Sequence, residues 1–321
     1  MKVVYSARYH IDIGPHVFPT RKYSLVHARL IETGVIDPSD VVEPAPASWE
    51  DLARVHTAEY LAKMRDGTID VAQLELPWSA GMVEAFRIMV GGTIHAARIA
   101  SGLEVRSQKS EVRKTGVVQD FRPARCCHIG GGLHHAFPNH GEGFCPFNDV
   151  AVAVRDLQSR GLERVAVVDL DVHHGNGTAF IFESDDRVFT FSMHQQHNYP
   201  MWKPKGSLDI GLPDGAGDSR FLRELEQALP VVMASDPQCV FYLAGADPYE
   251  DDQLGGLRLT RDGLRQRDRM VIETVHSARV PLVITLAGGY ARYVEDTVAI
   301  HVTTIDEAKR AAAETRTHEE T

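Results

Sequence analysis

Cysteine is scarce in this 321-residue chain, which contains only Cys126, Cys127, Cys145 and Cys239. Two of the four are adjacent, and no pair has the CxxC spacing of zinc ribbons and redox motifs. Disulfide frameworks are typical of small secreted domains that cannot build a sufficient core, whereas 43% of these residues are hydrophobic. We therefore predict reduced, buried thiols in a chain that is long enough to bury a sizeable core.

Long hydrophobic runs and an excess of basic residues are also missing. No stretch approaches the roughly 18 apolar residues of a membrane span, and the net charge is −10 with a pI of about 5.9. An acidic balance argues against nucleic acid as the main partner, because phosphates are neutralised by Lys and Arg. The first residues, MKVVYSARYH, are typical of a strand and not of a signal peptide. We expect a cytoplasmic protein with neither a nucleic-acid nor a membrane partner.

Short β-branched runs alternate with longer helical patterns along the chain. The run at 164–171 is almost wholly apolar, as expected of a parallel strand covered on both faces. Alternation of this kind indicates βαβ units around a parallel sheet, and hence an α/β fold. Strands are predicted at 3–5, 126–129, 164–171, 187–193, 239–244 and 281–286, and helices at 48–61, 79–99, 147–160, 218–234 and 261–278.

No internal repeat or domain linker interrupts this pattern, so a single domain over residues 1–321 is predicted. Residues 101–125 are charged and polar, and we interpret them as a loop insertion at the surface. Residues 305–321 form a charged tail that is expected to end in a frayed helix.

Carboxylates and imidazoles gather where the predicted strands end, which is where open α/β sheets bind their ligands. Asp171 and His173 are two residues apart, so in an extended chain both side chains point to the same side. Asp247 follows another strand and can supply a third ligand. Three protein ligands leave the open position of a catalytic zinc site. An oxygen-rich set with one histidine suits Zn²⁺ and also tolerates Fe²⁺.

Two adjacent histidines, His134 and His135, follow the glycine run at 130–132. Asp169 and Asn176 are available as their hydrogen-bond partners. A histidine bonded to Asp is held as imidazolium more readily than one bonded to Asn. The pair can therefore have different pKa values and different roles.

A tyrosine, Tyr290, follows two glycines at the end of the strand at 281–286. From that place its hydroxyl can lie over a bound carbonyl and donate a hydrogen bond to a developing oxyanion.

Five motifs, GGGLHHAF, GEGFCPFND, VDLDVHHGNGT, GADP and AGGY, occur in an order that resembles the zinc-dependent histone deacetylase family. HVFPTRKY, DQLGGL and an Asn at 176 are similar to its class IV branch and bacterial relatives. The resemblance covers nearly the whole chain and implies an arginase/deacetylase-type fold, a three-layer α/β/α domain with a central parallel sheet. It implies a metal-dependent amidohydrolase that removes an acetyl or longer acyl group from lysine side chains. The insertion at 101–125 exceeds what the family usually places there.

The resemblance also implies a role for each matched residue. The metal ligands are Asp171, His173 and Asp247. The general base and acid is His135, with His134 as its electrostatic helper and Asp169 and Asn176 as their partners. Tyr290 stabilises the oxyanion, with Gly288 beside it. The walls of an acyl-lysine tunnel are Gly143, Phe144 and Tyr199. A structural K⁺ is implied at the segment containing Asp169, Asp171, His173, Ser192 and Met193.

Three alternatives remain open at this point. The substrate can be an acylated lysine in a peptide or protein, or an acylated small amine such as an acetylpolyamine. A ureohydrolase of the same fold needs a second metal and further carboxylates, but Gly175 and Gly245 stand where these would be expected. A binder of acyl-lysine that has lost catalysis is disfavoured, because every expected catalytic position is filled.

Overall fold

The described part of the chain, residues 1–103 and 124–319, contains one sheet of eight strands in which every neighbouring pair is parallel. In this computed structural model the strand order is β2-β1-β3-β8-β7-β4-β5-β6. The strands are β1 (Lys2–Val4), β2 (Val41–Val42), β3 (Arg125–His128), β4 (Val165–Asp169), β5 (Val188–Gln195), β6 (Leu208–Leu212), β7 (Cys239–Leu243) and β8 (Leu282–Thr285). The predicted parallel sheet is confirmed, and each predicted strand lies in it.

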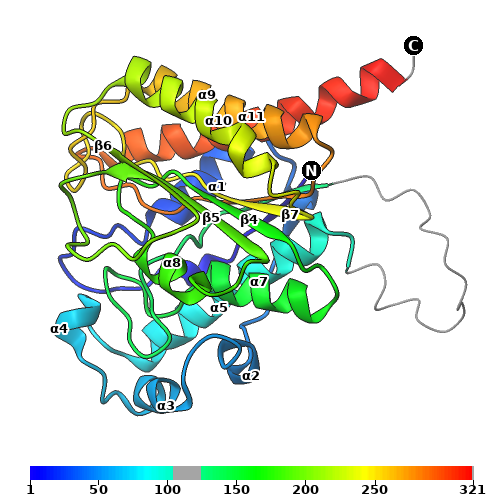
Figure 1. Cartoon of the computed structure of the whole chain (residues 1–321). Helices are drawn as coiled ribbons and strands as arrows, with labels where there is room; N and C mark the ends of the chain where they lie inside the picture. Colours follow the sequence, from blue (N-terminus) through cyan, green and yellow to red (C-terminus); the bar gives the residue numbers. More distant parts are fainter. Residues whose placement is uncertain (104–123, 320–321) are drawn as a thin grey trace, which may run out of the picture.

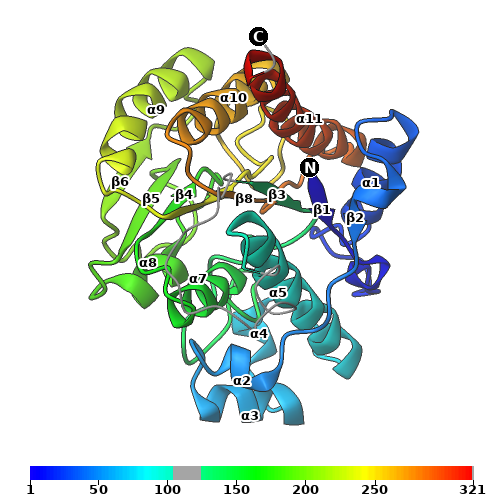
Figure 2. The same cartoon turned by 90° about the vertical axis from the view of Figure 1, so that its right-hand side faces the viewer.

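Helices cover both faces of the sheet and complete an α/β/α arrangement (Figure 1). One layer is formed by α5 (Ala80–Ala100), α7 (Asp149–Ser159) and α8 (Asn176–Phe182). The other is formed by α1 (Lys22–Glu32), α9 (Asp218–Met233), α10 (Arg261–Ser277) and α11 (Val294–Glu319). Figure 2 shows the two layers above and below the strands. The short helices α2 (Trp49–Leu52), α3 (Ala58–Asp66) and α4 (Val71–Leu74) lie beyond the α5 layer.

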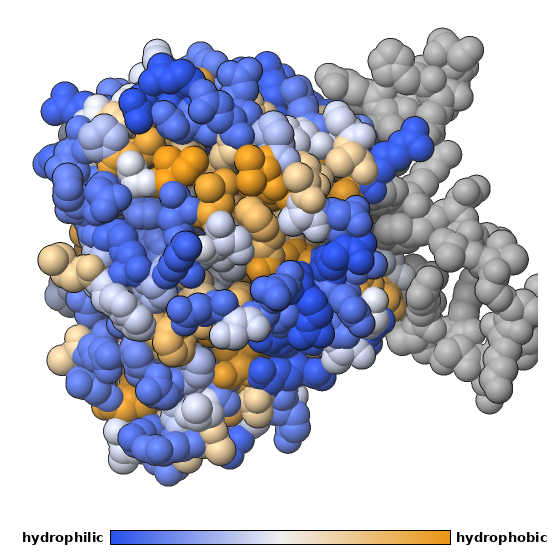
Figure 3. All heavy atoms as spheres, viewed as in Figure 1, coloured by the Kyte–Doolittle hydropathy of each residue, from blue (hydrophilic) through white to orange (hydrophobic). Residues whose placement is uncertain are grey.

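Burial explains why the central strands are apolar throughout. All residues of β4, β7 and β8 are buried, since helices pack on both faces. The four cysteines are free and buried, as predicted. The face in Figure 3 is mostly hydrophilic, with hydrophobic side chains in separate groups. No helix within 1–103 and 124–319 has the length and apolar character needed to cross a membrane.

One predicted helix, 48–61, is two helices in the structure. The capping box of Ser48 and Asp51 begins α2 as expected, but α2 ends at Leu52, and Thr57 caps the separate helix α3. The chain leaves the helical path between them to bury His56, whose Nδ1 lies 3.0 Å from the carbonyl oxygen of Phe137. Helical periodicity does not reveal such a contact with a distant segment.

Other differences concern short or polar elements. Helix α1 and the edge strands β2 and β6 were not predicted, because they lack a long apolar run. Of the predicted tail at 305–321, the described residues 305–319 continue a helix that already begins at Val294. Of the predicted insertion at 101–125, residues 104–123 lie outside the described residues.

A buried arginine links α10 to the ends of two central strands. Arg267 is fully buried, and its Nη1 donates to the carbonyl oxygens of Gly245 at 2.5 Å and Leu170 at 3.4 Å, just beyond β7 and β4. Its Nε donates to the Asp268 carboxylate at 2.9 Å. A buried cation is tolerable only when paired and hydrogen-bonded, so this contact fixes where both strands end.

Replacing Arg267 by Met is expected to lower the free energy of unfolding by about 3–5 kcal/mol, because the Asp268 charge is left buried without its partner. Urea unfolding measures this. Arg220→Met is the control, since it breaks an exposed ion pair with Glu224 that is worth about 0.3–0.5 kcal/mol. Equal effects of the two substitutions would contradict the role given to Arg267.

Candidate active site

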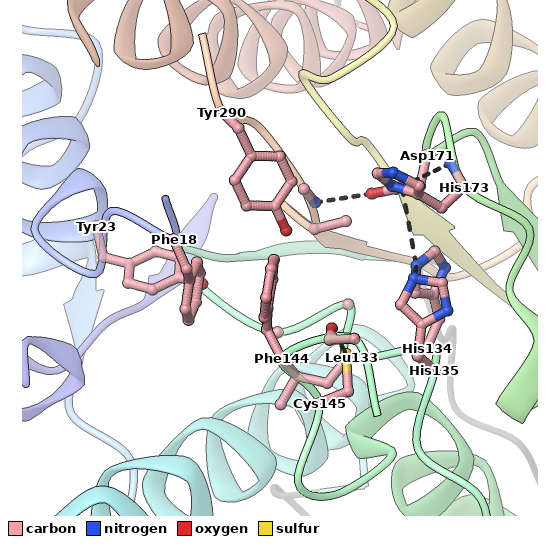
Figure 4. Close-up of a pocket in the computed structure, with 15 residues that line it drawn as sticks. Phe18, Tyr23, Leu133, His134, His135, Phe144, Cys145, Asp171, His173 and Tyr290 are labelled. Carbon is pink, nitrogen blue, oxygen red and sulfur yellow. Dashed lines mark hydrogen bonds and ion pairs between the residues drawn. The ribbon is translucent and has the colours of Figure 1, made fainter. Parts of the chain in front are cut away.

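The predicted site residues come together at the carboxyl ends of β3, β8, β7 and β4, which are neighbours in the sheet. Parallel strands all end at the same edge, so segments far apart in the sequence meet there. The segments that follow these strands carry His134 and His135, Tyr290, Asp247, and Asp171 with His173. Figure 4 shows the two histidines on one side of a pocket and Tyr290 across it.

Asp171, His173 and Asp247 are buried, and one ligand atom from each lies within 4.8 Å of the others. His173 Nδ1 is 3.1 Å from Asp171 Oδ1 and 3.5 Å from Asp247 Oδ2. The structure thus brings together the three predicted ligands, and within the described residues they form the one group of this kind.

The environment of these carboxylates fits a cation. Asp247 Oδ1 accepts a hydrogen bond from the Val172 amide at 2.9 Å, whereas the buried Oδ2 has no hydrogen-bond partner. A Cβ at Gly288 would lie 1.9 Å from that Oδ2 and 2.6 Å from Asp171 Oδ2. Glycine therefore leaves open the space beside both carboxylates, and a buried carboxylate oxygen without a donor is stabilised by a metal ion.

Burial and mutual repulsion act on the protonation of this group. Burial, and then the neighbouring Asp171, raise the pKa of Asp247 to about 7. Burial lowers the pKa of His173, but the hydrogen bond to Asp171 and the charges of Asp171 and Asp247 together outweigh burial and raise the pKa to about 10. Without a cation the site therefore holds protons on groups that a metal needs deprotonated.

The two adjacent histidines have the two different partners that the sequence suggested. His134 Nδ1 lies 2.6 Å from Asp169 Oδ2, and His135 Nδ1 lies 2.7 Å from Asn176 Oδ1. Burial lowers the pKa of both imidazoles, but the charges of Asp169 and Asp171 and the hydrogen bond to Asp169 together outweigh burial and raise that of His134 to about 9. At His135 the bond to Asn176 and the Asp171 charge do not compensate, and the pKa falls well below its usual value because of burial and the neighbouring His134 and His173.

The two rings meet through their Nε2 atoms, which are 3.1 Å apart. The pKa directions make His134 an imidazolium and His135 neutral, so His134 Nε2 donates and the His135 Nε2 lone pair accepts. A charged donor thus lies beside a neutral acceptor at the pocket, an arrangement suited to acid–base chemistry.

The pocket beside these groups has a volume of about 20 Å³. Eight of the predicted site residues line it: His134, His135, Gly143, Phe144, Asp171, His173, Gly288 and Tyr290. Burial raises the pKa of Tyr290 well above its usual value, so its hydroxyl stays protonated and can donate. The backbone amide of Tyr290 donates a hydrogen bond to Asp252 Oδ2 at 2.7 Å, which fixes the position of the tyrosine backbone.

Four predicted residues lie around this pocket without lining it. Asp169 and Asn176 stand behind the histidines, and Asp247 lies next to His173, whose Nδ1 is 3.5 Å from Asp247 Oδ2. Tyr199 flanks His135, with the two ring centroids 5.0 Å apart in an edge-on contact.

Several neighbours of the site were not singled out from the sequence. Phe18 and Tyr23 line the pocket, and Lys22 lies behind it, where its Nζ donates to the Ala287 carbonyl at 2.9 Å. Burial lowers the pKa of Lys22 to about 8. All three lie within the HVFPTRKY motif at residues 16–23. Their position in that motif is the signal that could have found them. Glu142 was missed in the same way, within GEGFCPFND.

Comparison with known proteins decides the family. The model of the histone deacetylase domain matches residues 16–305. This chain belongs to the histone deacetylase family. Membership supports a deacetylase enzyme that depends on a metal ion. The buried group of Asp171, His173 and Asp247 can hold such an ion.

Relatives match over most of the chain. An uncharacterized protein of Picosynechococcus is 40% identical over 305 residues, covering 93% of this chain and 95% of the relative. A probable deacetylase of Archaeoglobus fulgidus is 32% identical and is covered over 76% of its length, with 85% of this chain matched. Histone deacetylase 2 of Arabidopsis thaliana is 29% identical, with 93% of this chain and 78% of the relative covered.

Solved structures agree on the architecture of the family. The crystal structure of an HDAC homologue complexed with SAHA has a TM-score of 0.79 at 24% identity, covering 96% of this chain and 84% of that one. An HDAC homologue from Aquifex aeolicus has a TM-score of 0.78 at 22% identity, with the same coverage. Together with the parallel sheet, these similarities confirm the arginase/deacetylase-type fold.

The affinity for a divalent cation is expected to rise with pH, about tenfold per unit between pH 7.5 and 9, because binding must displace the proton of His173. Competition with a chromophoric chelator, corrected for the chelator's own protonation, measures this. A histidine with the usual pKa of about 6.5 would give a flat affinity above pH 7.5. A flat curve in that range would therefore contradict the proton assigned to His173.

Proposed function

We propose that this protein hydrolyses the amide bond between an acyl group and a lysine side chain or related amine, and that residues 1–321 act as one catalytic domain. The observation that carries the proposal is the histidine pair. A charged His134 and a neutral His135 meet within one pocket beside the group formed by Asp171, His173 and Asp247.

The proposed cofactor is one Zn²⁺, held by Asp171, His173 and Asp247, with Fe²⁺ as the alternative. When bound, the ion polarises the acyl carbonyl and lowers the pKa of a water molecule. The segment of Asp169, Asp171, His173, Ser192 and Met193 is the proposed site of a structural K⁺. In support, Asp169 and Ser192 are paired in register on neighbouring strands.

His135 is the proposed general base and acid. Its Nδ1 is engaged by Asn176 at 2.7 Å, so Nε2 carries the lone pair of the ring, which accepts from His134 Nε2 when no substrate or water takes its place. His135 Nε2 accepts the proton of the attacking water and later donates it to the leaving amine. His134 remains charged through its bond to Asp169 and stabilises the negative charge that develops on the substrate.

Tyr290 is the proposed donor to the oxyanion of the tetrahedral intermediate. Its ring is held by Phe144 and Phe18, whose centroids lie 6.0 Å and 6.4 Å away. Phe144, Gly143 and Tyr199 are the proposed walls of the tunnel, with Gly288 beside the reacting carbonyl. Aromatic walls without charge suit the neutral stem of an acyl-lysine.

Pocket size favours a short acyl group. The volume of about 20 Å³ is close to what one water molecule needs, which is on the order of 10–15 Å³. An acetyl group is the shortest of these acyl groups and needs the least displacement of the lining side chains, whereas octanoyl and myristoyl chains need a deep channel. We therefore propose acetyl as the preferred group, on lysine or on a polyamine.

A panel of acetyl-, octanoyl- and myristoyl-lysine peptides and acetylpolyamines tests this function. We expect zinc-dependent release of acetate that a chelator abolishes, with longer acyl groups hydrolysed more slowly. The wild-type chain should contain one metal equivalent. Two equivalents with activity on a guanidino substrate would support a ureohydrolase instead. Binding of acyl-lysine without turnover in the zinc-loaded protein would support the non-catalytic binder.

Tyr290→Phe is expected to lower kcat about 100-fold or more, since one oxyanion donor is lost, while metal content stays at that of the wild type. Metal analysis and acetate release measure the two effects. The control is Tyr293→Phe, because Tyr293 is 67% exposed. A Tyr290→Phe enzyme with full activity would refute the role of this hydroxyl.

A further inference from the structure

Glu142 begins a tight turn against the active site. The Cys145 amide donates to the Glu142 carbonyl at 2.9 Å, and the two central residues, Gly143 and Phe144, have φ angles of 54° and 65°. Positive φ at both central positions is typical of a type I′ turn. A Cβ at Gly143 would lie 2.6 Å from the His135 ring, so the turn packs directly against the proposed base.

The carboxylate of Glu142 is turned inward from this position. Its side chain is 18% exposed. Its Oε1 accepts hydrogen bonds from Asn176 Nδ2 at 2.6 Å and from the Tyr199 hydroxyl at 3.1 Å. Its Oε2 lies 3.4 Å from His140 Nε2. One carboxylate thus contacts both the partner of the base and a proposed tunnel wall.

The bond from Asn176 to Glu142 decides which way the amide faces. A carboxylate accepts hydrogen bonds, so the amide NH₂ must point to Glu142 and the amide oxygen to His135. The oxygen in turn accepts from His135 Nδ1 at 2.7 Å. The proton of the neutral ring is therefore on Nδ1, and the lone pair is on Nε2, where it accepts from His134 Nε2 at 3.1 Å. A flipped amide would place two oxygens in contact and reverse the ring tautomer.

We propose that Glu142 is a positioning residue that orients Asn176 and thereby sets the tautomer of His135. The proposal rests on the proposed function and deepens it. It also explains why residue 176 is an amide, whereas its counterpart behind His134, Asp169, is a carboxylate. A carboxylate at position 176 would face that of Glu142 at hydrogen-bond distance without a proton between them, and like charges so close repel.

A charge exchange between the two positions tests this pairing. Asn176→Asp alone is expected to lower kcat on the order of tenfold or more, with KM changed by less than about threefold. Glu142→Gln alone keeps an acceptor oxygen and is expected to have a much smaller effect. In the double variant the amide introduced at position 142 can donate to the carboxylate introduced at position 176, so kcat is expected to recover part of the loss, namely the part due to repulsion, while the new carboxylate still favours the charged form of His135. Glu183→Gln, at the exposed C-terminal end of the same helix as Asn176, is the control.

Rescue is the decisive outcome, because a purely structural defect in each variant would add to the other. Additive losses in the double variant would overturn the proposal. Metal content and thermal unfolding are measured for each variant to show that it is folded and loaded.

A second measurement does not require turnover. In zinc-loaded wild-type protein labelled with ¹⁵N-histidine, NMR is expected to show His135 as the Nδ1–H tautomer, whereas Glu142→Ala is expected to show a mixture of tautomers. An unchanged tautomer in Glu142→Ala would overturn the proposal. If the wild type hydrolyses no member of the acyl panel, the proposed function fails, and the NMR result still decides the role of Glu142.

Discussion

The burial of three aspartates at one edge of the sheet is the constraint on which the rest of the site depends. Asp169, Asp171 and Asp247 are at most 3% exposed, and buried carboxylates are costly without donors or cations. Backbone amides meet part of this need, since Asp171 accepts from His173 at 3.0 Å and from Gly288 at 2.8 Å. Arg267 donates to the carbonyl oxygens of Leu170 and Gly245, which follow strands β4 and β7. Asp247 Oδ2 remains without a hydrogen-bond donor, and a metal ion can fill this place.

The same constraint differentiates the two histidines. Asp169 neighbours His134, which is thereby held as a cation, whereas His135 faces an amide and stays neutral. The polar contacts form a chain from Glu142 through Asn176, His135 and His134 to Asp169, with a carboxylate at each end. The ends differ in what they touch. Asp169 contacts the imidazole of His134 directly, whereas Glu142 reaches His135 through the amide of Asn176, so the two rings have different partners and different pKa values.

Much of this site could be predicted from the sequence, because its residues sit within short motifs at strand ends. Asp171 and His173 are two residues apart, and the expected extended chain would place their side chains together. In the structure the chain bends after β4 ends at Asp169, and the two side chains still meet, at 3.1 Å. The sheet itself followed from apolar runs such as that of β4. The break between α2 and α3 could not be predicted in this way, since it results from the contact of His56 with a loop 81 residues away. Arg267 was missed for a similar reason, because its sequence neighbours give no sign of the carbonyls that it binds.

The sequence by itself therefore determined the chemical groups of the site, namely three side chains that can ligate a metal, a histidine pair with unlike partners and a tyrosine after two glycines. It also determined the parallel sheet, since strand periodicity and apolar runs are local properties of the chain. The tertiary structure alone decided which groups meet. It set Asp247 against Val172, 75 residues away, and Glu142 against Asn176, 34 residues away. The physical reason is that desolvation, charge attraction and amide orientation depend on distances in space, and strand order and turn geometry decide these distances.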